Sequence, residues 1–489
     1  MVTPELRIIL VFLTSLISAV FLIPKLSRIA TKIGLVDHPG LRKMHDRPLP
    51  LVGGLAMVIS ATFSFLLFIP LVGFRGYFVG VAILMLIGFL DDYREIGHRE
   101  KFLAQILATS MLAYLSKIYL VSFGDLLGFG AIMLPDSKLI QWGVTVFCVV
   151  GVINAINLLD GLDGLAGGFS AIAFLTFAAH ASLTGNSTVM MINLALLGAV
   201  IGFLRFNLAP AQVFMGDAGS LCLGFSLAFM SLVLTQGEGG SVKPVIALLI
   251  LAVPIVDTIT VMSKRILRGK SPFKPDRYHL HHIFVRFGMS KEWSVKVILG
   301  VCAIFCGISL LGTVYSIPEW ILFLVFVLYF AGYVISSMYI IYIMRFSQKV
   351  IMHSKMPDGL NFWDSPGLVR LFEKVKIYRH MRRSSRHPVF LEIECLYNEK
   401  DISYKGSVVN ISNGGVMTKI PLLQEFLGEV ILRLQFEIDG KKHMLELPAR
   451  HLWSAKNDES DLHGFQFLDF DDKKNDVIFR MMVKSKKAI

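Results

Sequence analysis

The stretch that decides the fold is Asn154-Ala155-Ile156-Asn157-Leu158-Leu159-Asp160-Gly161-Leu162-Asp163-Gly164, which closes one long apolar run and opens the next. Its polar residues recur at every third position: Asn154, Asn157, Asp160 and Asp163. On a helix this spacing keeps the four side chains near one face. Oxygen-bearing side chains in an apolar segment are costly to desolvate unless a partner binds them, and Mg²⁺ prefers oxygen ligands. The alternative is that these residues cap or turn a helix end beside two glycines.

The composition places this stretch in a membrane protein. Of 489 residues, 54% are hydrophobic and 17% are charged, whereas a water-soluble domain carries about a quarter charged residues. The apolar excess lies before about residue 345, which predicts a polytopic membrane domain followed by a polar domain. The net charge of +12 indicates basic cytoplasmic loops rather than nucleic-acid binding. The five cysteines show no metal-binding or disulfide spacing, and we expect the first apolar run to be a retained span.

Eleven apolar runs have the length of membrane spans: 6–23, 51–72, 77–90, 102–121, 139–157, 164–183, 188–205, 213–234, 244–262, 295–314 and 319–344. Basic residues concentrate in two segments, 25–47 and 264–291. These segments fall on the same side if the spans alternate, and the positive-inside rule makes that side the cytoplasm. The prediction therefore places the N-terminus outside and the C-terminus inside.

Four polar motifs fall on this predicted cytoplasmic side: Asp91-Asp92, the Asn154–Gly164 stretch, Phe214-Met215-Gly216-Asp217 and His279-Leu280-His281-His282. Motifs from distant parts of the chain that share one face of the membrane predict one active site built from several loops. Two adjacent carboxylates at a membrane boundary repel each other unless a cation or a proton is shared, although a solvated loop start is the alternative for Asp91 and Asp92.

The other candidates each have a simple alternative. Asp217 suits a metal ligand or a helix N-cap, and Lys101 suits a substrate-binding cation or an interfacial anchor. The 271–282 loop contains two prolines, which favour a fixed shape. Its histidines and Arg277 suit a phosphate-bearing anion better than zinc, because no cysteine accompanies them. For Asp257, a role in the site and burial beside an arginine are equally open.

The four motifs resemble those of the polyprenyl-phosphate N-acetylhexosamine-1-phosphate transferases of glycosyltransferase family 4. The resemblance covers about residues 1–345 and includes Leu51-Val52-Gly53-Gly54. The His-x-His-His form is similar to the branch that uses UDP-N-acetylglucosamine to begin O-antigen, enterobacterial common antigen or teichoic acid. The peptidoglycan branch typically has three consecutive histidines, and here Leu280 interrupts the run.

The resemblance implies that undecaprenyl phosphate attacks the β-phosphorus of a UDP-sugar, that UMP leaves, and that Mg²⁺ or Mn²⁺ is the cofactor. It also implies a homodimer in the bacterial inner membrane. The implied roles are metal ligation by Asp217 and Asn157, catalysis by Asp91, Asp92, Asp160 and Asp163, and substrate binding by Lys101, Asn154, Arg277, His279, His281 and His282. We expect Asp91 to bind or position rather than to remove a proton, because a phosphate monoester has a second pKa of about 6.

The polar C-terminal part begins with a charged linker, 346–380, in which the segment 367–378 is predicted to be amphipathic. Short alternating segments at 389–397, 405–410 and 430–438 then predict a small β-barrel. Two motifs flank its first strands: Arg382, Arg383 and Arg386, and then Asn410, Ser412 and Gly415. Taken singly, the first motif fits a juxtamembrane basic patch and the second a hairpin turn. Together they resemble the PilZ domain, whose Arg-x-x-x-Arg and Asp/Asn-x-Ser-x-x-Gly motifs bind cyclic di-GMP.

The sequence thus predicts a polytopic α-helical membrane protein with about eleven transmembrane helices, residues 1–345, followed by a linker and a small cytoplasmic β-barrel, residues 381–489. The predicted function is transfer of N-acetylhexosamine 1-phosphate to undecaprenyl phosphate in surface-polysaccharide synthesis, under cyclic-di-GMP control. Another UDP-sugar is an open alternative. A transporter would instead place its carboxylates near mid-span, and a catalytically idle receptor would be expected to have broken acidic motifs.

Overall fold

The structure is a computed structural model that describes residues 3–37, 48–70, 73–94, 96–236, 242–267, 269, 279–286, 289–353, 387–397, 402–412, 415–419, 429–438, 441–457 and 460–468. These residues separate into a helical unit that ends at His353 and a unit of strands that begins at His387. The amphipathic segment predicted at 367–378 lies outside the described residues.

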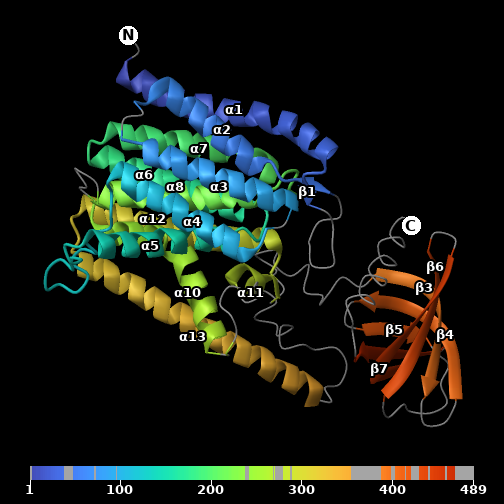
Figure 1. Ribbon diagram of the computed structural model, residues 1–489. Helices are drawn as coiled ribbons and strands as arrows, with labels where there is room; N and C mark the ends of the chain where they lie inside the picture. The colour runs from blue at the N-terminus through green and yellow to red at the C-terminus, as the bar shows by residue number, and fades with distance from the viewer. Residues whose placement is uncertain are drawn as a thin grey trace. The chain divides into compact units, whose positions relative to one another are not determined.

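Thirteen helices make up the described part of the helical unit (Figure 1). They are α1 (Pro4–Ile33), α2 (Gly53–Phe68), α3 (Arg75–Arg94), α4 (His98–Ser116), α5 (Lys138–Leu159), α6 (Leu165–Leu183), α7 (Ser187–Asn207), α8 (Gly216–Gln236), α9 (Pro244–Ile250), α10 (Ala252–Ile266), α11 (Leu280–Arg286), α12 (Lys291–Val314) and α13 (Glu319–His353). Two short strands, β1 (Val36–Asp37) and β2 (Leu49–Pro50), pair in antiparallel fashion.

Each of the eleven apolar runs corresponds to a helix or, for 244–262, to the pair α9 and α10. The predicted count of eleven spans is not reproduced, however. Within the described residues, eight helices are long and apolar enough to cross a membrane, or nine if α9 and α10 are one bent span. The helix α2 has only 16 residues, and α4 does not pass the same test of length and hydropathy.

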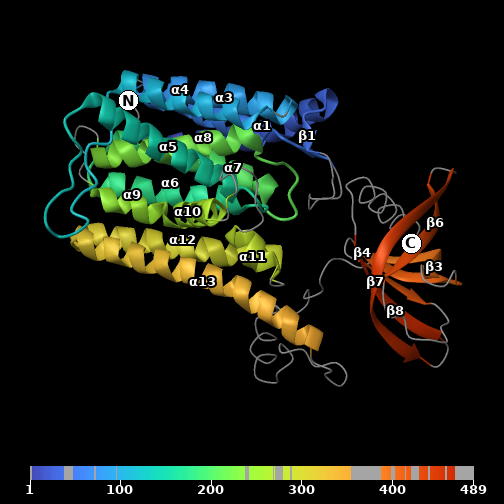
Figure 2. The same ribbon diagram turned by 60° about the horizontal axis from the view of Figure 1, so that its bottom comes forward.

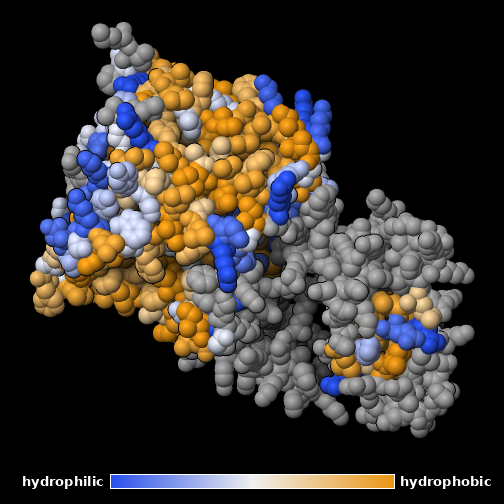
Figure 3. Space-filling view, in the orientation of Figure 1, coloured by the Kyte–Doolittle hydropathy of each residue, from blue (hydrophilic) through white to orange (hydrophobic). Residues whose placement is uncertain are grey.

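The surface of the helical unit fits a lipid environment. Figures 1 and 2 show the long helices running roughly side by side. Apolar side chains cover the middle of this unit in Figure 3, and hydrophilic side chains gather towards the two ends of the helices. Such a band is what helices need when they cross hydrocarbon, because no water is present there to solvate polar groups.

The helix ends and contacts follow from local sequence. The N-cap of the helix α1 is Thr3, whose hydroxyl accepts a hydrogen bond from the Leu6 N–H, and its C-cap is Gly34 with φ 79°. Gly198 and Gly202 of α7 face α1 so closely that an added Cβ would clash with it. Small residues of this kind let membrane helices pack backbone to backbone.

A break between α9 and α10 bends the chain by 74°. Leu251 lies at the break, and Pro254 follows in the first turn of α10. Proline has no N–H to donate, so it is tolerated in a first turn and not in a helix interior. The bend turns α10, which carries Asp257, away from the direction of α9.

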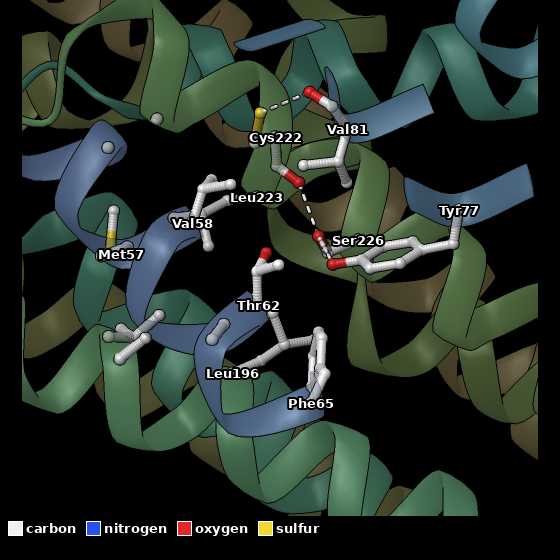
Figure 4. A pocket seen from close by; sticks show the side chains of 15 residues that line it. Met57, Val58, Thr62, Phe65, Tyr77, Val81, Leu196, Cys222, Leu223 and Ser226 are labelled. Atoms are coloured by element: carbon white, nitrogen blue, oxygen red, sulfur yellow. Dashed lines mark hydrogen bonds between the residues drawn. The ribbon is translucent and has the colours of Figure 1, made fainter. Parts of the chain in front are cut away.

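A small apolar cavity lies between α2, α3, α7 and α8 (Figure 4). Its volume of about 20 Å³ is the space that one water-sized molecule needs, since about 10–15 Å³ is the minimum. The hydroxyls of Tyr77 and Ser226 lie 2.9 Å apart beside it. Because the Ser226 hydroxyl donates to the Cys222 carbonyl, the Tyr77 hydroxyl donates to Ser226. The hydroxyls of Tyr77 and Ser226 are therefore both satisfied within the protein.

The unit of strands contains β3 (His387–Tyr397), β4 (Ile402–Ser412), β5 (Gly415–Lys419), β6 (Glu429–Ile438), β7 (Lys441–Asn457) and β8 (Ser460–Phe467). The strands close into a barrel in the order β3-β4-β5-β8-β7-β6, and all neighbours are antiparallel. Alternate residues face inward, as Val430, Leu432 and Leu434 do in β6. The three strands predicted from sequence match β3, β4 and β6.

Candidate active site

The acidic motifs and Lys101 lie at the ends of four helices, and these helix ends are close together. Asp91 and Asp92 lie in the last turn of α3, Lys101 in the first turn of α4, Asn157 in the last turn of α5 and Asp217 in the first turn of α8. The helices α3 and α4 are joined by three residues only, so Lys101 necessarily lies near Asp91. The contacts between these side chains bring three of the four motifs together at one end of the helical unit.

We call Asp91, Lys101, Asn157 and Asp217 the acid cluster. The Lys101 ammonium lies 2.7 Å from Asp91 Oδ2 and 2.6 Å from Asp217 Oδ2. Asn157 Nδ2 donates to Asp217 Oδ1 at 3.1 Å and to the Ser220 hydroxyl at 2.8 Å. The charged side chains are 12–28% exposed, so an ion from water can reach them.

The side chain of Asp92 has a different position from that of Asp91. Its two oxygens accept hydrogen bonds from the backbone N–H groups of Asp217 and Ala218, at 2.8 and 3.2 Å. It therefore caps α8, whose N-terminus favours a negative charge. Gly216, with φ 72°, leaves room for this carboxylate, since a Cβ there would clash with Asp92. In this arrangement Asp92 fixes the orientation of Asp217.

The Leu51–Gly54 segment holds the chain just before Asp217. The Gly53 N–H donates to the Phe214 carbonyl at 3.0 Å, and the Gly54 N–H donates to the Met215 carbonyl at 2.9 Å. Leu51 and Phe214 also form a parallel β-bridge. These bonds position the start of α8, which explains why a segment without charged side chains belongs to the same set of motifs.

The helical register expected for Asn154, Asn157, Asp160 and Asp163 is wrong for its second half. The helix α5 ends at Leu159, and Asp160 is its exposed C-cap. Asp163 follows in the turn before α6, where its carboxylate accepts the Ala211 N–H at 3.0 Å. The alternative of a turn at a helix end holds for these two residues. Asn154 lies within α5 and donates to Gln105 Oε1 at 2.7 Å.

The histidine motif is anchored to α10 through Asp257. His279 Nδ1 lies 2.8 Å from Asp257 Oδ2, and the Leu280 N–H donates to Asp257 Oδ1 at 3.0 Å. The Tyr333 hydroxyl of α13 donates to the same Oδ1 atom. The partners of the buried Asp257 shown by the structure are thus a histidine and a tyrosine, and not the arginine that the sequence left open. We call Asp257, His279, His281 and Tyr333 the histidine network.

His281 connects this network to the turn after α5. Its ring stacks on His279, with centroids 5.9 Å apart and planes at 9°, and it lies beside Gly161, where a Cβ would clash with it. Neither ring nitrogen has a hydrogen-bond partner among the described residues, although the side chain is buried. Burial lowers the pKa of His281 to about 3, so the ring is neutral at physiological pH. The neighbouring His282 ring lies 4.2 Å from it, centroid to centroid.

The acid cluster has the donor set for a divalent cation. A ready-made group of three or more acidic, histidine or cysteine side chains is not found in the described part of the chain. The Lys101 ammonium nevertheless marks one point that two carboxylate oxygens face. Oxygen ligands from Asp91 and Asp217, completed by substrate phosphates, are what Mg²⁺ requires. Asn157 is bonded to one of these carboxylates and can orient it or contribute its own oxygen.

Some predicted site residues lie outside the described residues: Arg277, Arg382, Arg383 and Arg386. In the barrel, Asn410 and Ser412 lie at the end of β4 and Gly415 begins β5, with Ser412 paired to Gly415. This is the hairpin that the residues alone suggested.

Sequence reasoning missed three contributors: Gln105, Ser220 and Tyr333. Ser220 follows Asp217 by one helical turn, which is a readable signal. Tyr333 lies in an apolar run with several other aromatic residues, and no local pattern distinguishes it.

Comparisons with known proteins cover both units. The glycosyl transferase family 4 model matches residues 74–235, a range that contains the whole acid cluster, and the PilZ domain model matches residues 380–484. Among solved structures, the PilZ domain of CeSA from a cellulose synthesizing bacterium is 21% identical over 21% of this chain and 99% of that chain, with a TM-score of 0.18.

The similarity to two curated relatives covers nearly the full length of each relative. An undecaprenyl-phosphate alpha-N-acetylglucosaminyl 1-phosphate transferase of Haemophilus influenzae is 34% identical over 360 residues, which are 72% of this chain and 98% of the relative. A protein of the same name from Pasteurella multocida is 35% identical over 338 residues, or 67% of this chain and 92% of the relative.

Proposed function

This chain belongs to glycosyl transferase family 4 and carries a PilZ domain, and we propose that it transfers N-acetylglucosamine 1-phosphate from UDP-N-acetylglucosamine to undecaprenyl phosphate. The observation that carries the proposal is the acid cluster, in which residues from four helices direct two carboxylates at one ammonium. The names of the relatives, which act on undecaprenyl phosphate, support the acceptor. The product would start a cell-surface polysaccharide.

In the proposed reaction, an oxygen of the lipid phosphate forms a new bond to the β-phosphorus of the UDP-sugar. The bond between this phosphorus and the bridging oxygen breaks, and the electron pair leaves with UMP. The acceptor is already largely dianionic at neutral pH, since its second pKa is about 6, so the chain need not remove a proton. Bound Mg²⁺ would supply positive charge to the diphosphate oxygens.

The residues of the chain would position the reactants. Asp217 and Asp91 would hold the metal ion, and Asp92 would keep Asp217 in place through the backbone of α8. Lys101, when a metal ion replaces it between the two carboxylates, would supply a cation to the lipid phosphate. The neutral His281 and its neighbours would line the site of the sugar diphosphate. Phosphoryl transfer depends mainly on such positioning and charge neutralisation.

The proposal also covers location and regulation. The domains would be a transferase domain at 1–345 in the bacterial inner membrane, with its site facing the cytoplasm, a linker, and a cytoplasmic cyclic-di-GMP sensor at 381–489. Arginine side chains at 382–386 suit phosphate groups, because guanidinium forks bind two oxygens at once. A homodimer is expected from the family resemblance alone.

The test of catalysis is radiolabelled transfer from UDP-N-acetylglucosamine to undecaprenyl phosphate by the purified full chain, with Mg²⁺ and with EDTA. We expect metal-dependent product from the natural protein and none from Asp217→Ala. Product with UDP-N-acetylgalactosamine and none with UDP-N-acetylglucosamine would correct the proposed donor substrate. No product from any UDP-sugar would favour a catalytically idle receptor.

The test of the sensor is calorimetric titration of the full chain with cyclic di-GMP. We expect binding by the natural protein and at least a tenfold weaker affinity after Arg382→Ala and Arg386→Ala are combined, since bonds to charged groups contribute about 1.5–3 kcal/mol each. Equal affinity in the two proteins would remove these arginines from the nucleotide site.

A further inference from the structure

Two hydrogen bonds tie α13 to α10 on successive turns of α13. The Tyr333 hydroxyl donates to Asp257 Oδ1, and Lys264 Nζ donates to the Ser337 hydroxyl at 2.6 Å. Only 11% of the residues in a window of its spanning segment are buried in the protein, Leu322 among them, while Phe326 and Tyr329 are half-buried against the core. A helix with so few fully buried residues can shift at smaller cost than a fully packed one, because fewer packed side chains resist the movement.

Asp257 is the point at which α13 meets the histidine motif. The residue is 3% exposed, and both of its carboxylate oxygens have donors. One oxygen accepts Tyr333 and the Leu280 N–H, and the other binds His279 Nδ1. A buried carboxylate that loses one donor must find another, since an unsatisfied charged group is costly. Moving Tyr333 therefore alters the hydrogen bonds that hold His279 and the start of α11.

From His279 the contacts continue to the turn after α5, next to the acid cluster in sequence. His279 stacks on His281, and His281 lies against Gly161. Gly161 follows Asn157 by four residues, and Asn157 donates to Asp217. The direct contacts thus run from α13 through Asp257, His279 and His281 to the turn after α5, and they end there, four residues along the chain from Asn157.

The chain after α13 leads to the sensor. The helix extends to His353, nine residues past the end of the predicted span, and the PilZ match begins at residue 380. Among the residues that the structure describes, α13 is the last helix before the PilZ match in sequence.

We propose that Tyr333 and Asp257 are positioning residues that couple α13 to the histidine motif, and that cyclic di-GMP controls the affinity for the UDP-sugar through this contact. The inference rests on the proposed function and names the route of its regulation. A nucleotide that moves α13 changes the bond between Tyr333 and Asp257 and, through it, the placement of His279 and His281. The effect should lie in the KM for the UDP-sugar more than in kcat, because the metal-binding carboxylates stay in place.

The experiment compares the full chain with two variants that each remove one hydroxyl from α13. Tyr333→Phe deletes the bond to Asp257. Tyr329→Phe is the matched control, one turn earlier on the same helix, with its ring packed on Phe305. KM for UDP-N-acetylglucosamine and its binding affinity by calorimetry are measured with and without cyclic di-GMP, and binding of cyclic di-GMP is measured in each protein.

We expect cyclic di-GMP to change KM and UDP-sugar affinity of the natural protein and of Tyr329→Phe by about 5-fold or more, the usual range of coupling between sites. In Tyr333→Phe the change should fall below about twofold, while cyclic di-GMP still binds with unchanged affinity. The binding readout does not need turnover, so it works even for a protein that fails to catalyse.

The outcomes separate the two proposals. An equal nucleotide response in Tyr333→Phe and in the natural protein would overturn the coupling and leave the transferase proposal intact. A natural protein that binds cyclic di-GMP with no change in KM or in UDP-sugar affinity would also overturn the coupling. The natural protein could also show no sugar-phosphate transfer and still bind the UDP-sugar with an affinity that depends on cyclic di-GMP. If Tyr333→Phe abolished that dependence, the coupling would be supported and the transferase proposal refuted.

Discussion

The acid cluster and the histidine network lie at the same end of the helical unit, yet they are built in opposite ways. The charged side chains of the acid cluster are 12–28% exposed and neutralise each other across a shared ammonium. Asp257 and His279 are only 4–5% exposed, and the carboxylate of Asp257 has a donor on each oxygen. The first group can exchange its partners with water and ions, whereas the second cannot do so without cost.

This difference separates two tasks. Partly exposed charges that are held close together suit the binding of a metal ion and phosphates, since the incoming cation replaces an existing one. A buried, saturated carboxylate instead fixes geometry. We therefore expect changes in the acid cluster to affect turnover and metal dependence, and changes around the histidine network to affect substrate affinity and stability.

The largest expected effect comes from Asp217→Asn, which removes one negative charge and keeps the size of the side chain. We expect kcat for sugar-phosphate transfer to fall by about 10³-fold, the upper range for the loss of one transition-state-stabilising group. The control is Asp136→Asn, an exposed acid in the loop between α4 and α5, at the far end of these helices. A rate within tenfold of the natural protein would remove Asp217 from the metal site.

The second effect concerns the shared ammonium. Lys101→Met leaves two carboxylates facing each other, so a divalent cation should stabilise the variant more than the natural protein. We expect the Mg²⁺-dependent rise in Tm to be larger by about 2–4 °C, the shift that roughly 1 kcal/mol gives in a large domain. Transfer should fall about 10- to 100-fold, as for the loss of charged hydrogen bonds.

The matched control for this variant is Lys138→Met, at the exposed start of α5. Tm is measured by differential scanning fluorimetry in EDTA and in Mg²⁺. An identical Mg²⁺ response in Lys101→Met and the natural protein would mean that the metal ion binds away from the point between Asp91 and Asp217.

These two predictions depend on residues that the sequence already singled out. Asp91, Asn157 and Asp217 could be predicted because charged and amide side chains are expensive at the ends of apolar helices and have few structural reasons to be there. The family resemblance added the roles, and the contacts bring these residues together. Even so, the sequence did not show that Asp92 caps α8, since Asp91 and Asp92 are chemically identical and only the packing of α3 on α8 distinguishes them.

The helical register predicted for Asp160 and Asp163 is wrong for a local reason. Three-residue spacing fits a helix, but Gly161 and Gly164 favour a turn, and Gly164 adopts φ 77°. The helix therefore ends at Leu159, before the third polar residue. Tyr333 could not have been found at all, because its partner Asp257 lies 76 residues away and the contact exists only through the packing of α10 on α13.

The third effect tests the contact between the histidine network and the turn after α5. In Gly161→Ala the new Cβ would clash with the His281 ring, so the ring must move. We expect KM for UDP-N-acetylglucosamine to rise about tenfold, or roughly 1.4 kcal/mol, with an unchanged Mg²⁺ dependence. Gly143→Ala on α5 is the control, since its added Cβ has nothing within 4 Å. An altered Mg²⁺ dependence with unchanged KM would contradict the separation of the two groups.

The smallest effect is a pH dependence of stability that His281 introduces. Burial lowers its pKa from 6.5 to about 3 in the folded protein, so only the unfolded state binds a proton as the pH falls below 6.5. Stability is therefore lost from pH 6.5 towards pH 3, at up to about 1.4 kcal/mol per pH unit.

We expect the natural protein to lose roughly 1 kcal/mol more of its free energy of unfolding than His281→Gln between about pH 7 and pH 5.5. Thermal unfolding of both proteins over this range checks the prediction, because all other titrating groups are common to them. Parallel stability curves of the two proteins would show that the His281 ring takes up a proton in the folded protein. The histidine network would then not differ from the acid cluster by containing a buried, unprotonated histidine.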